Sequence, residues 1–310
     1  MVFRIPRIIL LISLLLLLSA CGTKATASIV LPQPSATITV TAFQPGPTST
    51  PLAPTPTPEP LAILVNGESI SLAEYNAELQ RFQASLKDTG KTIAAGDAQK
   101  QVVSNLVDET LLAQAAFKGG LDLDDAAVAK RITDLTTQVG GSQAFSDWMK
   151  KNFYSDDSLK VALRRSIAAA WQRDHVTSTA PTTADQVHAR QMLFLDPDTA
   201  DRYYQQLKAG ADFATLAFAV DPDTGGDLGW FPKGYLVLPE IETAAFALQP
   251  GQFSQVIKTT YGYQIIFVQE RDSQHPLSAD ARRLIQQQLL ENWLKDQNAQ
   301  SKIEILVPSQ

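Results

Sequence analysis

The sequence has one cysteine and three histidines in 310 residues. A single cysteine excludes a fold held together by internal disulfides, and it excludes any multi-cysteine zinc or iron–sulfur site. Three scattered histidines form neither a His-rich metal centre nor a serine–histidine–aspartate triad, so we expect no metal and no cofactor. An excess of basic residues is also lacking, because 26 Lys and Arg stand against 32 Asp and Glu. This charge balance argues against a nucleic-acid-binding protein.

The first twenty residues have the pattern of an export signal. An arginine-containing start precedes an apolar run from Ile8 to Leu18, and this run is too short to cross a bilayer core that needs roughly 20 residues. The tetrapeptide Leu-Ser-Ala-Cys that ends at Cys21 resembles a bacterial lipobox, in which the cysteine becomes the lipidated first residue. The alternative is an ordinary secretory signal followed by a cysteine. Because the only cysteine falls at the cleavage point, we expect a signal peptide at 1–20 and a lipid anchor on Cys21, at the outer face of the plasma membrane.

Residues 21–60 have the composition of a tether. Nine of the 18 prolines lie between Pro32 and Pro60, with seven threonines among them, and Glu59 is the only charged residue there. Proline has a fixed φ and no N–H group, so this stretch favours extended conformations over a packed core. It is either a spacer that holds a soluble module away from a membrane or a leader with no length requirement.

Residues 61–180 have the pattern of a helical domain. Ala62 to Val65 predicts a short strand closed by the turn dipeptide Asn66-Gly67, and Ser71 has the spacing of a helix cap with Glu74. Apolar residues then recur with helical periodicity. The predicted helices span about 72–87, 97–118, 124–138, 142–151 and 156–174. The residues predicted to pack in the core of the last two are Phe145, Trp148, Met149, Leu159, Leu163, Ile167 and Trp171.

The next segment predicts a small domain of mixed helix and strand at about 185–272. Strands are expected at Val187 to Leu195 and Tyr263 to Gln269, with a glycine turn in "GGDLGWF" at 225–231. The predicted helices begin near residues 198, 212 and 239.

Several of these segments resemble the parvulin family of peptidyl-prolyl isomerases. They are "HARQMLF", "LKAGADFATLA", "GGDLGWFPKG" and "PEIETAAFALQPGQFSQVIKTTYGYQIIFV", in the family's order and spacing. The preceding "ILVNGESISLAEYNAEL" and "VVSNLVDETLLAQAAFKGGLDLDDAAVAKRI" resemble the helical domain of extracytoplasmic foldases of the PrsA and SurA type. The resemblance implies an α+β fold, in which a parvulin domain with a four-stranded sheet is inserted into a helical chaperone-like domain.

The C-terminal run closes this arrangement. Ser278 to Asn298 has the pattern of a helix, and Lys302 to Val307 alternates as a strand. By family precedent this tail returns to the helical domain, so that residues 277–308 complete it and the strand pairs with Ala62 to Val65. The alternative is a free helix on the isomerase-like domain.

The resemblance also implies site residues, and here the sequence departs from the family. Two family histidines correspond to Gln191 and Gln264, and the Cys or Asp beside the groove corresponds to Asp221. Glutamine offers hydrogen-bond donors and an acceptor but never becomes charged. An apolar substrate groove is expected from a further set of residues. They are Leu193, Val237, Leu238, Ile241 and Phe246.

Two functions follow from this reading. The first is a membrane-anchored foldase that isomerises Xaa-Pro bonds of unfolded exported polypeptides without a covalent step. The alternative is a holdase chaperone that uses the same groove only to bind peptides, which the Gln191 and Gln264 pair favours. A solute-binding lipoprotein of a transporter would need two similar α/β lobes, and the helical segment at 61–180 argues against it.

Overall fold

The computed structural model describes residues 59–307, so the predicted signal peptide, the lipidation site Cys21 and the tether up to residue 58 lie outside the described residues. Residues 61–310 form one compact unit of the chain. Every hydrophobic cluster among the described residues lies in this unit. We therefore expect residues 61–310 to fold on their own.

The helical region opens with a β-hairpin. β1 (Leu61–Val65) pairs antiparallel with β2 (Glu68–Ser71), and Asn66 and Gly67 between them both have positive φ. Positive φ at two central residues is the geometry of a tight hairpin turn. The sequence predicted β1 and the turn but not β2, because "ESIS" has one apolar residue and therefore little alternation.

Helices follow close to the predicted boundaries. They are α1 (Leu72–Asp88), α2 (Ala95–Lys118), α3 (Asp125–Gln138), α4 (Ser142–Lys151) and α5 (Asp156–Ser178). The Ser71 hydroxyl caps α1 by accepting a hydrogen bond from the backbone N–H of Glu74 at 3.1 Å. α2 presents Val102, Leu106 and Leu111 to the core, where they pack with β1 and β2.

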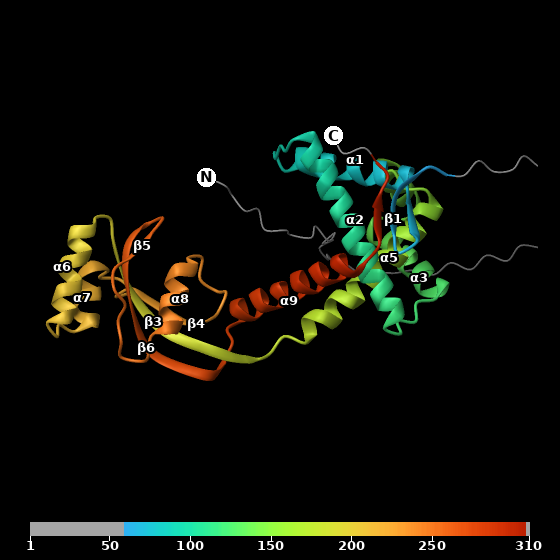
Figure 1. Cartoon of the computed structure of the whole chain (residues 1–310). Coiled ribbons are helices and arrows are strands. Elements are labelled where there is room, and N and C mark those ends of the chain that lie inside the picture. The colour runs from blue at the N-terminus through green and yellow to red at the C-terminus, as the bar shows by residue number, and fades with distance from the viewer. Residues whose placement is uncertain (1–58, 308–310) are drawn as a thin grey trace, which may run out of the picture. The chain divides into compact units, whose positions relative to one another are not determined.

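The C-terminal segment returns to this region. α9 (Ala279–Gln300) lies beside α2 and α5, and β7 (Ile303–Ile305) pairs antiparallel with β1 (Figure 1). In this pairing Ile63 stands opposite Ile305, which gives the strand order β2-β1-β7. The predicted pairing of the tail with Ala62 to Val65 is therefore confirmed, and the alternative of a free C-terminal helix is wrong.

Residues 183–276 hold a second, four-stranded antiparallel sheet with the strand order β4-β3-β6-β5. Its strands are β3 (Thr183–Phe194), β4 (Asp227–Pro232), β5 (Ile257–Thr259) and β6 (Gly262–Pro276). The accompanying helices are α6 (Pro197–Lys208), α7 (Phe213–Val220) and α8 (Pro239–Ala247). α8 covers one face, where Ile241 packs on Ile266, and α6 and α7 cover the other, where Phe213 packs near Met192.

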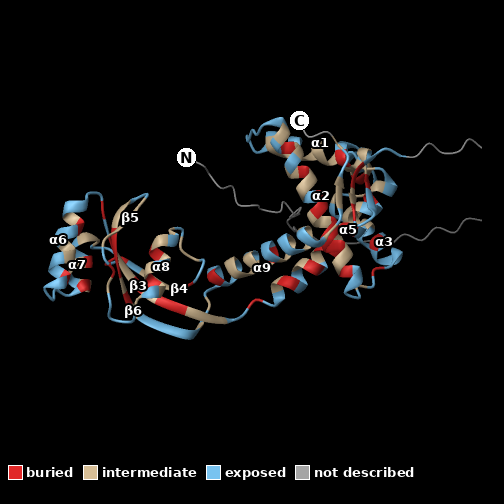
Figure 2. Ribbon diagram, viewed as in Figure 1, coloured by how far each residue is buried: buried red, intermediate tan, exposed pale blue. Residues whose placement is uncertain are grey.

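β3 and β6 are longer than the sequence predicted. β3 begins at Thr183 and β6 continues to Pro276, so the two strands extend beyond the sheet as a paired ribbon. This part of β6 is largely exposed (Figure 2), and it therefore lacks the apolar residues that mark a buried strand. The predicted α+β fold class, with helical region and inserted sheet, is confirmed.

One predicted core residue differs. Trp171 on α5 is 36% exposed and stacks on His175, at a ring-centroid distance of 5.3 Å. The helical periodicity placed it correctly on the face turned toward α2, but that face is not covered over its whole length.

Candidate active site

The two glutamines lie on one face of the second sheet. Gln191 on β3 stands opposite Ile266 on β6, and Leu193 stands opposite Gln264. Because alternate residues of a strand share a face, these four side chains all point to the side that α8 covers. Gln191 and Gln264 are thus diagonal cross-strand neighbours, a spacing that long side chains can bridge.

Gln264 is held by a single hydroxyl. Its side chain is 2% exposed, and Nε2 donates a hydrogen bond to Thr259 Oγ1 at 3.1 Å. The same hydroxyl accepts from the backbone N–H of Tyr261 and donates to the carbonyl of Gly262. Oε1 of Gln264 is buried and has no hydrogen-bond partner among the described residues. The amide therefore keeps an acceptor unused in the interior, which is a costly arrangement unless another group supplies a donor.

The predicted groove residues do not form one set. Leu193 is 40% exposed beside the glutamines, whereas Ile241 is buried on the face of α8 that packs against the sheet, and Leu238 is partly buried against the same cluster. Val237 is 86% exposed. Phe246 packs edge-on against Phe231.

The position of Phe246 follows from the strand register. Phe231 stands opposite Val187 on β3, six residues before Leu193, which corresponds to about 20 Å along a strand. The structure therefore brings Gln191, Leu193 and Gln264 together and leaves Phe246 at the other end of the sheet.

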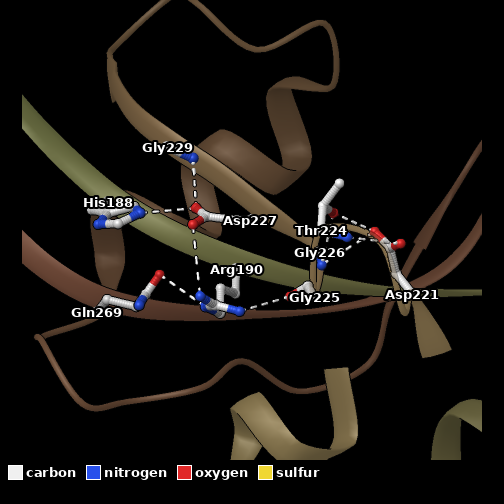
Figure 3. A network of polar contacts seen from close by, with 9 residues as sticks. All are labelled: His188, Arg190, Asp221, Thr224, Gly225, Gly226, Asp227, Gly229 and Gln269. Carbon is white, nitrogen blue, oxygen red and sulfur yellow. Dashed lines mark hydrogen bonds and ion pairs between the residues drawn. The ribbon is translucent and has the colours of Figure 1, made fainter. Parts of the chain in front are cut away.

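Asp221 begins the loop between α7 and β4 and holds it together through its side-chain hydrogen bonds. Its Oδ1 accepts hydrogen bonds from the backbone N–H groups of Asp223 and Thr224. Its Oδ2 accepts from the Thr224 hydroxyl and the Gly226 N–H (Figure 3). The hydrogen bond from the Thr224 hydroxyl is the largest cause that holds the pKa of Asp221 below its usual value. The carbonyl of Gly226 in turn accepts the N–H of Gln191 at 2.8 Å. Asp221 thus touches the glutamine pair only through this loop.

A second set of contacts fixes the other side of the same loop. Arg190 Nη1 donates to the carbonyl of Gly225 and its Nε donates to Gln269 Oε1, both at 3.2 Å (Figure 3). Asp227 Oδ2 lies 3.7 Å from Arg190 Nη2, while Asp227 Oδ1 lies 2.8 Å from His188 Nε2. Arg190 is the neighbour of Gln191 on β3, and because successive side chains of a strand alternate, it points to the opposite face of the sheet. Sequence reasoning missed this network and Thr259, because neither has a periodic or spacing signal.

Replacing Thr259 with valine is expected to reduce isomerisation of a proline peptide and to lower stability by about 1–2 kcal/mol. Valine preserves the side-chain shape but leaves the Gln264 amide without its hydrogen-bond partner. Thr260→Val, at an exposed neighbouring position, is the matched control. Equal peptide isomerisation rates and equal melting temperatures for the two variants would contradict a role for the Thr259 hydroxyl in positioning Gln264.

Residues 59–307 have no group of three or more His, Cys, Asp and Glu side chains that could hold a metal ion. This part of the chain also has no helix that is long and apolar enough to cross a membrane.

Comparisons with known proteins place both regions. Residues 179–270 match the PPIC-type PPIase domain family, and residues 36–172 match the SurA-like N-terminal domain family. The chain is 31% identical over 223 residues to the foldase protein PrsA of Caldanaerobacter subterraneus subsp. tengcongensis, a match that covers 66% of this chain and 71% of that protein. It is 30% identical over 223 residues to the foldase protein PrsA of Geobacillus sp. (strain WCH70), covering 67% and 76%. A crystal structure of the peptidylprolyl isomerase PrsA from Bacillus cereus matches with a TM-score of 0.46 and 22% identity, covering 79% of this chain and 93% of that one.

The sheet with α8 on one face and α6 and α7 on the other, together with the match at 179–270, defines a parvulin-class peptidyl-prolyl isomerase domain. The helical region before it is of the SurA-like class. The chain belongs to the PrsA foldase family.

Proposed function

We propose that this protein isomerises Xaa-Pro bonds of unfolded exported polypeptides with Gln191 and Gln264 in place of a histidine pair. The observation that carries the proposal is the buried Gln264 amide beside Leu193, whose Nε2 is fixed by Thr259 and whose enclosed Oε1 lacks a hydrogen-bond donor among residues 59–307. Both glutamines lie on the same face of the sheet, where an apolar substrate segment can be sheltered from water.

The chemistry requires no proton transfer and no covalent step. Rotation about the prolyl C–N bond has a barrier of about 18–20 kcal/mol, because resonance stabilises the planar forms. A site accelerates the rotation only if it binds the twisted amide better than either planar form. Neutral amides can supply hydrogen bonds to such a state, and the Gln191 and Gln264 pair offers both donors and acceptors.

Asp221 has a positioning role in this proposal. Its hydrogen bonds are made within the loop at 221–226, and the loop fixes the backbone of Gln191 through Gly226. Leu193 is the apolar side chain that the groove exposes beside the glutamines, and Val237 contributes at its exposed rim. Ile241 and Leu238 support the groove from the buried cluster behind it. Phe246 stabilises the packing of α8 rather than contacting substrate.

The location and the domain limits are part of the same proposal. A signal peptide at 1–20, lipidated Cys21 and a tether at 21–60 would hold the protein on the outer face of the plasma membrane, where exported polypeptides emerge. The helical chaperone-like domain comprises 61–180 with 277–308, and the parvulin domain comprises 185–272. No nucleic-acid partner is proposed.

The test is the cis-to-trans isomerisation of a short Xaa-Pro peptide by residues 61–310. The wild-type fragment is compared with a Gln191→His/Gln264→His double variant. We expect the wild-type fragment to accelerate isomerisation and the double variant to add little, because the groove and its hydrogen bonds are already formed.

Two outcomes would contradict the proposal. If only the double variant is active, the groove is intact but the natural protein acts as a holdase. If neither form is active while both remain folded, the aliphatic groove does not support catalysis at all. Suppression of aggregation of an unfolded protein, measured on the same samples, separates the holdase function from a loss of both.

A further inference from the structure

The helical region contains a hollow that is remote in sequence from the glutamine pair. It has a volume of about 300 Å³ and lies where α2, α5 and α9 meet. α2 contributes the residues around Gly119, α5 contributes Trp171 and Gln172, and α9 contributes Trp293. Three elements that lie far apart in sequence therefore build one site on this region.

Two indole rings line the hollow. Trp171 is 36% exposed although it lies on a helix face that packs against α2. Trp293 packs against the cluster of Leu112, Ala169 and Leu290. Gly119 lies against the Trp171 ring, because an added Cβ there would lie 3.5 Å from the ring and 3.1 Å from the Ala115 carbonyl oxygen. Aromatic walls of this kind bind proline rings of extended peptides.

Two glutamine amides face the same space without partners. Gln172 is 8% exposed and lines the hollow, and so does Gln297 on α9. Neither side chain makes a hydrogen bond with any of residues 59–307. The Gln172 amide is not among the fully enclosed unsatisfied groups, so it keeps access to the hollow. An amide offers one acceptor and two donors, which suits the C=O and N–H groups of an extended peptide backbone.

The charge at the rim selects the kind of peptide. Lys118 lines the hollow and has no ion-pair partner in the described part of the chain. It lies in the last turn of α2, where the helix dipole favours a cation. His175 also lines the hollow and stacks on the ring of Trp171. This local cation is complementary to a carboxylate of a ligand bound in the hollow.

We propose that this hollow is a second peptide-binding site, which takes a proline ring of an extended acidic segment from a client polypeptide. The inference rests on the proposed foldase function and extends it: the tryptophans hold the ring, Gln172 and Gln297 bond the backbone, and Lys118 pairs with a neighbouring carboxylate. A client held here is kept extended while its other prolines remain free for the parvulin domain.

The experiment titrates residues 61–310 with the blocked peptide Ala-Glu-Pro-Ala-Glu-Pro-Ala while the indole N–H signals are followed by NMR. The signals of Trp171 and Trp293 are expected to shift, whereas those of Trp148 and Trp230, which do not line the hollow, are expected to stay in place. A peptide with alanine at both proline positions is expected to bind roughly tenfold more weakly. A peptide with glutamine at both glutamate positions is expected to bind more weakly at low salt and equally at high salt.

Gln172→Leu preserves the packing volume and is expected to weaken binding about fivefold without lowering the melting temperature. Gln287→Leu, on the exposed side of α9, is the matched control and should bind as the wild type does. Unmoved Trp171 and Trp293 signals at saturating peptide, or equal affinity of both variants, would overturn the proposal. Tenfold weaker binding by residues 21–310 than by 61–310 would also overturn it, because the tether would then be the occupant.

The isomerase assay separates this proposal from the previous one. Gln172→Leu should leave isomerisation of a short Xaa-Pro peptide unchanged. If no form isomerises the peptide and the two indole signals still shift, the catalytic proposal fails and the second site stands.

Discussion

Gly226→Ala is expected to destabilise the parvulin domain by about 3 kcal/mol or more, from steric overlap and backbone strain together. Gly226 has a φ of +65°, and a Cβ at this position would lie 1.8 Å from the carbonyl oxygen of Gln191. The loop must then move away from β3, which breaks the hydrogen bond from the Gln191 N–H to Gly226. We therefore expect both a lower melting temperature and a loss of peptide isomerisation.

Gly229→Ala is the matched control for this prediction. Gly229 has a φ of +66°, yet nothing lies within 4 Å of an added Cβ. It should therefore incur only the conformational cost, about 1–2 kcal/mol. Thermal unfolding followed by near-UV circular dichroism measures both. Equal destabilisation of the two variants would show that the contact with Gln191 is not what makes Gly226 necessary.

Glu109→Gln is expected to stabilise the helical region at pH 8 by up to about 3 kcal/mol, from the difference between two pKa values. Burial is the main cause that raises the pKa of Glu109 from 4.5 to about 7. Glu74 and Glu78 on α1 raise it further, while Arg165 on α5 and Arg81 on α1 oppose the shift. The protonated carboxyl is thus the form that the fold prefers.

The direction of the pH dependence follows from the proton balance. Between about pH 4.5 and pH 7 the unfolded chain has released the proton of Glu109 while the folded chain still holds it, so stability falls as pH rises. Above about pH 7 the full penalty remains. Glutamine imitates the neutral acid and removes this dependence.

Urea unfolding at pH 5 and pH 8 tests this prediction. The stability difference between Glu109→Gln and wild type should be larger at pH 8 than at pH 5. Glu291→Gln, on the exposed side of α9, should show no such increase. A gain for Glu109→Gln that is the same at both pH values would contradict the assignment of the effect to ionisation.

Most of the architecture could be read from local signals. Ser71 and Glu74 marked the start of α1, the apolar spacing marked α2 and α5, and the segments around "GGDLGWF" and "TTYGYQIIFV" pointed to the parvulin class. The sequence did not predict β2 or the extensions of β3 and β6, because exposed strands lack the alternation of apolar residues that marks a buried strand.

The candidate site could be predicted only in part. Motif spacing placed Gln191 and Gln264, and cross-strand register explains why residues 73 positions apart become neighbours. Phe246 was expected in the groove from the parvulin resemblance, whereas the structure packs it against Phe231, which stands opposite Val187. Thr259, Arg190 and Asp227 gave no signal, since hydrogen bonds between loops and strands leave no periodic trace in a sequence.

The sequence by itself determined the order of the elements, the fold class and the pair of glutamines at the positions where the parvulin resemblance places histidines, because each depends on composition, short-range periodicity or motif spacing. Only the tertiary structure decided which polar atoms lack partners. The free acceptor of Gln264 and the hollow between Trp171 and Trp293 exist because strands and helices distant in the chain meet at fixed angles and leave particular groups uncovered. That packing, rather than any local pattern, determines where we propose that this protein holds a peptide.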